Sequence, residues 1–314
     1  MSDKPTIGFI GVGLMGHGMA KNIVEKGYDL VVMGHRNREP VEDLLQRGAT
    51  EAKTPAEMAG RASIIHLCVT GSAQVEQLVN GEDGLLGAMG DGHTLIDTST
   101  SEPPSTLRIA EALEAKGVRF ADAPLSRTPK EAEAGTLDAM VGADDETFAI
   151  VEPVIRTWAA KVIRTGPVGT GHTMKLLNNF IALGYGALYS EAVALGAKAG
   201  LAPQVFDSVI SEGRMRNGFY DTFMQYVVGR DPNAHKFTLA NALKDASYLA
   251  DLANSVGAHN PVGAAVRNTY AAAVAAGRED DYVPMVSDFV ADVNGVSLTD
   301  FDAGGRHDAP GAKG

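Results

Sequence analysis

Cysteine, tryptophan and basic residues are all scarce in this chain. Its 314 residues include one cysteine, Cys68, so no disulfide can form within the chain, and we expect a reducing, cytoplasmic setting. The 27 Lys and Arg residues are outnumbered by 39 Asp and Glu residues, which gives a formal net charge of −12. Because nucleic acids and anionic membranes repel an acidic surface, we expect neither as a partner.

Several other signals are missing. We find no apolar run of the roughly 18 residues that a membrane span requires. The first residues show no cationic leader and no small-residue cleavage pattern, so we expect no signal peptide. His17 and His172 flank glycine-rich turns, but the His-x-x-x-His and Cys/His spacings of metal sites are absent, and we predict no metal centre.

The length and the order of patterns predict two domains. Short apolar strands alternate with helices from Thr6 to about Gly166, which is typical of a doubly wound α/β sheet of Rossmann type. After Gly200 every pattern is helical, with segments expected at 203–212, 219–228, 239–256, 263–276 and 283–293. We therefore predict a dinucleotide-binding domain over residues 1–166, an all-α domain over 167–302, and a disordered tail over 303–314.

A long interdomain helix is expected to join the two domains, starting after the glycines at 166, 169 and 171. Its pattern is apolar on nearly every face, which predicts burial. It also carries Lys175 and Asn179, which share one face because they are four residues apart. A buried lysine needs a partner or a purpose, so we expect Lys175 to reach a cleft between the domains. The small residues of the helix suit a subunit interface in a homodimer or homotetramer.

The N-terminal glycine motif predicts dinucleotide binding. Gly11, Gly13 and Gly16 form G-x-G-x-x-G between an apolar strand and a helix, with Leu14 and Met15 inside the same loop. In this motif the first glycine permits a tight turn, the second lets the backbone approach a pyrophosphate, and the third allows close packing of helix on strand. The start of the helix then offers its free N–H groups to the phosphates.

The turn after the second strand favours NADP(H) over NAD(H). An enzyme that prefers NAD usually has Asp or Glu there, to bind the ribose 2′-hydroxyl. This chain has Gly34 followed by His35, Arg36, Asn37 and Arg38. Planar guanidinium groups match a 2′-phosphate, so we predict that Arg36 and Arg38, with His35 beside them, bind it. A solvated basic loop is the alternative.

Four motifs in this order resemble those of the β-hydroxyacid dehydrogenases, the family of 3-hydroxyisobutyrate dehydrogenase and tartronate semialdehyde reductase. The motifs are the N-terminal glycine loop, Asp-Ala-Pro-Leu-Ser at 122–126 with Ala-Gly-Thr-Leu at 134–137, Gly-Thr-Gly-His-Thr-Met-Lys-Leu-Leu-Asn-Asn at 169–179, and Lys-Asp at 244–245. The resemblance covers essentially residues 5–300 and implies reversible hydride transfer between a short β-hydroxy acid and its semialdehyde.

The resemblance also implies roles for single residues. Lys175 corresponds to the family's catalytic lysine, which acts as general acid in reduction and as general base in oxidation. Asn179 and Ser126 correspond to residues that hold the substrate, and Lys244 to a lysine near both substrate and nicotinamide. The remaining matches are to cofactor contacts, at Val69, Thr70 and Thr100.

One departure from the family concerns the substrate loop. The family's Ser-Gly-Gly is replaced by Ser126-Arg127-Thr128, with Lys130 close behind. An arginine adds a bidentate anion-binding group, and relatives such as sulfolactaldehyde reductase show a similar change. We therefore predict that Ser126, Arg127 and Thr128 bind the substrate, and that Arg127 reads a carboxylate or another anionic group. In the alternative, Arg127 points outward and only caps the loop.

Three rival interpretations remain open. A 6-phosphogluconate dehydrogenase relative would have a His-Asn pair where this chain has Asn178 and Asn179. Imine reductases share the fold but commonly replace the lysine. A non-catalytic NADP-binding sensor would be expected to lose Lys175 or Asn179, and both are present. The substrate itself, a small anionic oxo or hydroxy acid, cannot be named from the sequence.

Overall fold

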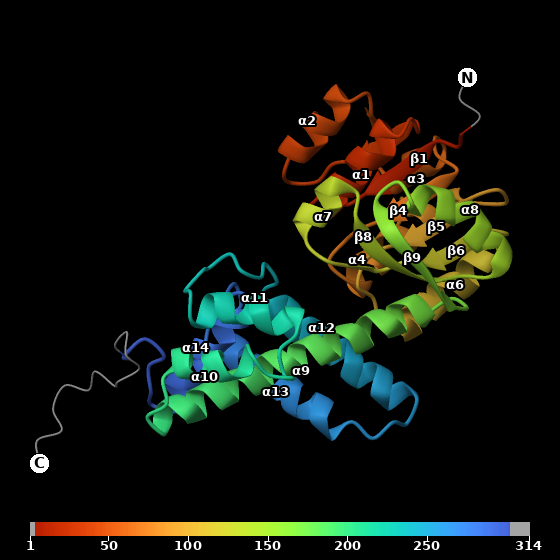
Figure 1. The fold of residues 1–314 in the computed structure, drawn as a ribbon. Helices are drawn as coiled ribbons and strands as arrows, with labels where there is room; N and C mark the ends of the chain where they lie inside the picture. The colour runs from red at the N-terminus through yellow and green to blue at the C-terminus, as the bar shows by residue number, and fades with distance from the viewer. Residues whose placement is uncertain (1–3, 302–314) are drawn as a thin grey trace, which may run out of the picture. The chain divides into compact units, whose positions relative to one another are not determined.

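The computed structural model describes residues 4–301, which divide into two compact units (Figure 1). The first unit ends at Leu176 and the second begins at Leu177. This division falls inside the long helix, later than the boundary expected after residue 166, because the first turns of that helix are bonded to the sheet of the first unit. The predicted tail, 303–314, lies outside the described residues.

The first unit is built on a nine-stranded sheet. Its strands are β1 (Ile7–Ile10), β2 (Leu30–Met33), β3 (Thr50–Glu51), β4 (Ile64–Leu67), β5 (Thr94–Asp97), β6 (Arg119–Asp122), β7 (Leu125–Ser126), β8 (Leu137–Gly142) and β9 (Ala159–Gly166). The order is β3-β2-β1-β4-β5-β6-β8-β7, with β9 beside β8. Strands β1 to β6 run parallel to one another, whereas β8 is antiparallel to β6 and β7 and parallel to β9. The doubly wound sheet expected from the sequence is confirmed.

Helices cover the two faces of this sheet. They are α1 (Gly16–Glu25), α2 (Glu39–Gln46), α3 (Pro55–Ala59), α4 (Ser72–Asn80), α5 (Leu85–Ala88), α6 (Pro103–Glu114), α7 (Pro129–Ala134) and α8 (Asp145–Ile155). Neighbouring residues of a strand point to opposite faces. Phe9 accordingly packs in one apolar cluster with Met19 and Trp158, and Ile10 in another with Met58. Burial on both faces explains why the strands are almost continuously apolar.

The second unit is helical. It contains most of α9 (Thr170–Lys198), then α10 (Pro203–Ile210), α11 (Gly218–Val227), α12 (Leu239–Ser255), α13 (Pro261–Ala275), the 3₁₀ turn η1 (Val283–Met285) and α14 (Val286–Val293). Side chains of Asn217, Thr238 and Asn260 cap the starts of α11, α12 and α13, which explains where these helices begin. No strand is assigned among the described residues of this unit, in which an isolated bridge pairs Thr238 with Tyr282, so the all-α expectation is confirmed.

The expected burial of α9 on nearly every face is wrong. Leu183 and Val193 are buried, but Ile181, Leu188 and Leu195 are 55%, 60% and 71% exposed. One apolar stripe of the helix is therefore left uncovered by residues 4–301. By length and composition alone α9 also meets the criteria for a membrane span, contrary to the sequence expectation, although 44% of its most apolar window is buried and core helices pass the same test.

His66 in β4 is a buried polar side chain at the centre of the first unit. Its ring stacks on Phe9 at 5.5 Å between centroids and meets the edge of Trp158 at 6.2 Å. Neither ring nitrogen has a hydrogen-bond partner, and burial lowers the pKa of His66 to about 3.

This environment predicts acid sensitivity. Unfolded His66 takes up a proton below about pH 6.5 and folded His66 only near pH 3, so its contribution to stability is complete above pH 6.5 and is lost as the pH falls. Between pH 7 and pH 5, we expect the free energy of unfolding to fall by about 2 kcal/mol more in the wild type than in His66→Phe. Urea titrations followed by fluorescence of Trp158, the single tryptophan, measure this difference. Equal losses in both proteins would contradict it.

Candidate active site

The glycine loop between β1 and α1 has the geometry that nucleotide binding requires. Gly11 has φ +99°, and a Cβ there would lie 2.1 Å from the carbonyl oxygen of Cys68. At Gly16 a Cβ would lie 1.9 Å from the carbonyl oxygen of Gly11, so only glycine lets α1 start this close to β1. A Cβ at Gly13 would meet no atom within 4 Å, which leaves room for a ligand at the uncapped start of α1.

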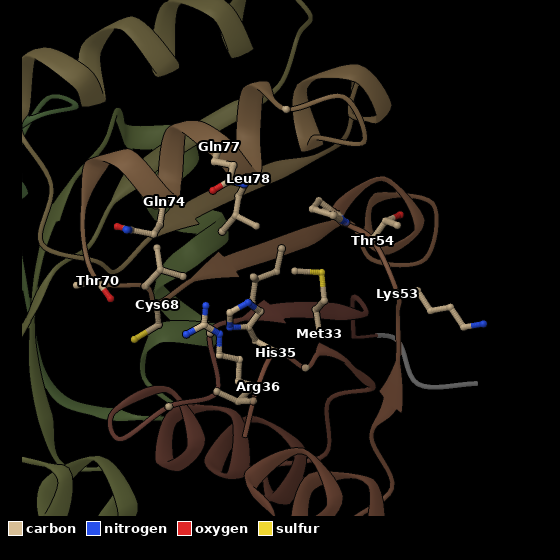
Figure 2. Close-up of a pocket in the computed structure, with 18 of the residues that line it drawn as sticks. Met33, His35, Arg36, Lys53, Thr54, Cys68, Thr70, Gln74, Gln77 and Leu78 are labelled. Atoms are coloured by element: carbon tan, nitrogen blue, oxygen red, sulfur yellow. The ribbon is translucent and has the colours of Figure 1, made fainter. Parts of the chain in front are cut away.

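A cavity of about 970 Å³ opens beside this loop, at the carboxyl ends of β1, β2 and β4 (Figure 2). Strand order reverses between β1 and β4, and open α/β sheets bind their ligands at such a switch point. Six of the predicted cofactor residues line the cavity: Gly11, Gly13, His35, Arg36, Val69 and Thr70. Burial raises the pKa of the Cys68 thiol in this wall to about 11, so Cys68 lacks the properties of a reactive nucleophile.

The other predicted cofactor residues do not line the cavity. They are Leu14, Met15, Gly16, Arg38 and Thr100 in the first unit and Lys244 in the second. Arg38 pairs instead with Glu51: its Nη1 and Nη2 atoms lie 2.6 and 3.0 Å from the two carboxylate oxygens. This pair lowers the pKa of Glu51, and it occupies the bidentate edge that a phosphate would use. In Figure 2 the side chain of Arg36 extends toward the cavity, whereas that of Lys53 points away from it.

Lys175 lies against the substrate loop of the first unit. Its Nζ atom donates a hydrogen bond of 2.8 Å to the carbonyl oxygen of Leu125, one residue before Ser126. The lysine is half-buried. The structure thus brings together the predicted catalytic lysine and the predicted substrate loop, which are 50 residues apart in the sequence.

Asp122 fixes the start of α9 and is a residue whose importance sequence reasoning underestimated. Its two carboxylate oxygens each accept a backbone hydrogen bond of 2.7 Å, one from Gly169 and one from His172. A Cβ at Gly171 would lie 2.7 Å from the carbonyl oxygen of Asp122, so the glycine-rich entry lets the helix approach the strand. Burial raises the pKa of this carboxyl. Asp122 thus holds the start of the helix that carries Lys175.

The buried surroundings of His172 complete this anchor. Its Nδ1 lies 2.7 Å from the Thr106 hydroxyl, which itself donates to the carbonyl oxygen of Glu102. The imidazole therefore carries its proton on Nδ1. Asp97 at the end of β5 accepts from the backbone of Ser99 and from the hydroxyl of Ser101, as expected for a loop-holding carboxylate.

The residues after Ser126 have structural partners of their own. Arg127 has φ +88°, a left-handed conformation that costs a non-glycine residue on the order of 1 kcal/mol. Its Nε lies 3.0 Å from Oδ2 of Asp138, and half of its side chain is exposed. Thr128 forms a capping box with Glu131 at the start of α7, so its hydroxyl is already engaged. The Thr128 hydroxyl is therefore occupied by Glu131 rather than available to a substrate.

In the second unit, Asp245 brings together the two predicted substrate residues. The Asn179 side-chain amide donates to Oδ2 of Asp245 at 2.6 Å, and the Lys244 ammonium lies 2.8 Å from Oδ1. Asp245 is buried, and it orients both groups. The sequence analysis assigned a role to Lys244 and none to Asp245. The carboxylate directly after a predicted site lysine was the sequence feature that pointed to Asp245.

Among residues 4–301, no group of three or more His, Cys, Asp or Glu side chains is arranged to hold a metal ion.

Comparison with known proteins agrees with these features. The sequence profile of the NAD binding domain of 6-phosphogluconate dehydrogenase matches residues 6–166. A second profile, described as NAD-binding of NADP-dependent 3-hydroxyisobutyrate dehydrogenase, matches residues 169–287. The 3-sulfolactaldehyde reductase of Escherichia coli K12 is 32% identical over 272 residues, which cover 87% of this chain and 91% of that protein. The 3-hydroxyisobutyrate dehydrogenase of Pseudomonas aeruginosa is 32% identical over 270 residues, which cover 84% of this chain and 90% of that protein.

Solved structures show the same fold. The crystal structure of 3-hydroxyisobutyrate dehydrogenase from Salmonella typhimurium aligns with a TM-score of 0.80 at 27% identity, over 91% of this chain and 100% of that chain. The structure of Mycobacterium tuberculosis 3-hydroxyisobutyrate dehydrogenase with L-serine aligns with a TM-score of 0.81 at 26% identity, over 91% of this chain and 99% of that chain. Because the similarity runs through both units, the chain belongs to the β-hydroxyacid dehydrogenase family and is an NAD(P)-dependent oxidoreductase of hydroxy acids and their semialdehydes.

Proposed function

We propose that the chain interconverts a short β-hydroxy acid and its semialdehyde, with Lys175 as the general acid and base. The observation that carries this proposal is the hydrogen bond from the Lys175 ammonium to the Leu125 carbonyl, at the loop that begins with Ser126. The bond directs a proton donor toward the loop expected to hold the substrate, on a helix whose start is anchored by Asp122.

Hydride transfer, proton transfer and substrate binding are each proposed for different groups of the site. A nicotinamide cofactor, when bound in the cavity, supplies or accepts the hydride. In reduction Lys175 gives a proton to the carbonyl oxygen, and in oxidation it removes the proton of the hydroxyl. Ser126 and Arg127 in the first unit are proposed to hold the acid group. Asn179 and Lys244 stay substrate residues by the family resemblance, and within the second unit Asp245 keeps both oriented.

Loss of the proton donor gives the first test. We expect Lys175→Ala to lower kcat by about 10²–10⁴-fold, the usual contribution of a positioned acid or base. The absorbance of NADPH and of NADH would be followed with the semialdehydes of succinic, methylmalonic and tartronic acids, with glyoxylate and with sulfolactaldehyde. Lys198→Ala, at the other end of α9 and bonded to the carbonyl of Asn294, is the matched control and should keep full activity.

The outcomes separate the rival interpretations. Turnover that survives in Lys175→Ala would move the acid to another residue. Tight NADPH binding by the wild type without turnover of any acid would favour the sensor. A 6-phosphogluconate dehydrogenase-like enzyme is disfavoured because the profile that matches residues 169–287 is that of 3-hydroxyisobutyrate dehydrogenase.

We further propose that the cofactor is NADP(H), with Arg36 and His35 at the 2′-phosphate. Gly34 stands where an NAD enzyme usually has a carboxylate, and Arg36 lines the cavity. The bidentate pair of Arg38 with Glu51 argues against Arg38 in this role. A reducing, cytoplasmic setting also remains a proposal, supported by the single cysteine.

The two arginines therefore predict different outcomes. Arg36→Ala should raise KM for NADPH by about tenfold or more and leave KM for NADH nearly unchanged, because only the former carries the 2′-phosphate. Arg38→Ala, which removes the same charge from the same turn, should change either KM by less than about threefold. Equal effects of both variants on KM for NADPH would refute the assignment.

We also propose that a second copy of the chain covers the exposed stripe of α9, giving a homodimer or homotetramer. Leu188 and Leu195 are 60% and 71% exposed, and Leu177, Ile181 and Tyr185 of the same helix are exposed as well. Sedimentation should find an oligomer for the wild type and monomers for Leu188→Glu/Leu195→Glu. Leu107→Glu alters a leucine of α6 that is 53% exposed, and it should leave the oligomer intact. A monomeric wild type would refute the proposal.

A further inference from the structure

Three residues of the substrate loop, Leu125, Ser126 and Thr128, are each held by a different partner. The Leu125 carbonyl accepts from Lys175, and Ser126 pairs with Asp138 in the ladder of β7 and β8. Thr128 is fixed by the capping box of α7. Arg127 therefore lies between a paired strand residue and a capped helix start, and both neighbours restrict its backbone.

Arg127 occupies a conformation that glycine would adopt at lower cost. Its φ of +88° is one of two positive φ values among the described non-glycine residues. Such a conformation persists only where the surroundings enforce it, and strained residues of this kind cluster at ligand-binding sites. An arginine at this position consequently calls for a functional reason.

Asp138 carries a second unfavourable feature. Its Oδ2 lies 3.0 Å from Nε of Arg127, but its buried Oδ1 has no hydrogen-bond partner. An unsatisfied buried carboxylate oxygen is unfavourable for folding. The ion pair between Arg127 and Asp138 therefore combines a strained backbone with an unsatisfied buried oxygen, directly after Ser126.

We infer that Asp138 is a positioning residue that holds the Arg127 guanidinium in the orientation needed to read the acid group of the substrate. This inference rests on the proposed function of the site. Asp138 engages the guanidinium through Nε, and the Nη1–Nη2 edge is the one that pairs with a carboxylate or sulfonate through two parallel bonds. Asp138 stands on β8, between β7 and β9, so its own backbone is rigid.

The inference distinguishes orientation from charge, because the two predict opposite effects of removing Asp138. If Asp138 acted only through its negative charge, its loss would make the loop more positive and tighten the binding of an anion. If Asp138 positions Arg127, its loss frees a long side chain that must be ordered again on binding, and an anion binds more weakly.

The experiment compares an anionic substrate with a neutral analogue. Sulfolactaldehyde and tartronic semialdehyde carry a sulfonate and a carboxylate, and glyceraldehyde has a hydroxymethyl group in that place. In Asp138→Ala we expect KM for both acids to rise about tenfold, with kcat within threefold and glyceraldehyde kinetics unchanged. Asp138→Asn keeps an acceptor for Nε and should show a smaller rise. Lys130→Ala removes a nearby charge from the same loop and should change each KM by less than threefold.

Arg127→Gly supplies a second readout. It should raise KM for the acids as much as Asp138→Ala does, while its unfolding temperature stays equal to or above that of the wild type, because the left-handed backbone suits glycine. A lower unfolding temperature with unchanged KM would show that the pair serves only the fold, and would overturn the inference.

Failure of the inference can be told apart from failure of the proposed function. An active wild type whose KM is unchanged or lowered in Asp138→Ala overturns the inference alone. A wild type that reduces none of the oxo acids overturns the proposed function. In that case binding of tartronate to the NADP-loaded protein, measured by calorimetry, decides the inference. Weaker binding by Asp138→Ala supports it, whereas equal, tighter or undetectable binding by the wild type and the variant overturns it.

Discussion

The buried carboxylate of Asp122 is the interaction on which the arrangement of the site depends. It sits at the end of β6 and accepts the N–H groups of Gly169 and His172, which would otherwise be unsatisfied at the start of α9. A buried charge is tolerated here because the helix end supplies donors and a favourable dipole. Without glycine at 171 the helix could not come this near. The position of Lys175, one turn further along, follows from this anchor, and its bond to the Leu125 carbonyl ties the helix back to the same segment that holds Asp122.

Unfavourable features gather around this anchor. Asp122 is a carboxyl whose pKa is raised by burial, Arg127 has a strained backbone, and Asp138 has a buried oxygen without a hydrogen bond. Elsewhere in the first unit, His66 apart, apolar side chains of the strands and helices pack in two clusters. A fold stabilised by those clusters can hold a few groups in costly positions, and such groups are expected where ligands bind.

On the cofactor side, the backbone geometry follows from local sequence, whereas the partners of the charged side chains depend on distant residues. The glycine motif acts through backbone geometry within a few residues, so its turn, its close packing and its open approach were all foreseeable from Gly11, Gly13 and Gly16. The two arginines after β2 are indistinguishable in sequence. Glu51 on the neighbouring β3 separates them, because it binds Arg38 and leaves Arg36 at the cavity.

The sequence by itself determined the alternation of strands and helices, the helical second unit, the glycine loop and the family resemblance, because these depend on periodicity and on short motifs. Tertiary structure decided which side chains meet. It paired Arg38 with Glu51, Arg127 with Asp138, and Asn179 with Asp245, and it left one stripe of α9 exposed. Side chains that are far apart in the chain become partners only through the packing of strands and helices. Their orientation is therefore a property of the folded molecule, and no local pattern encodes it.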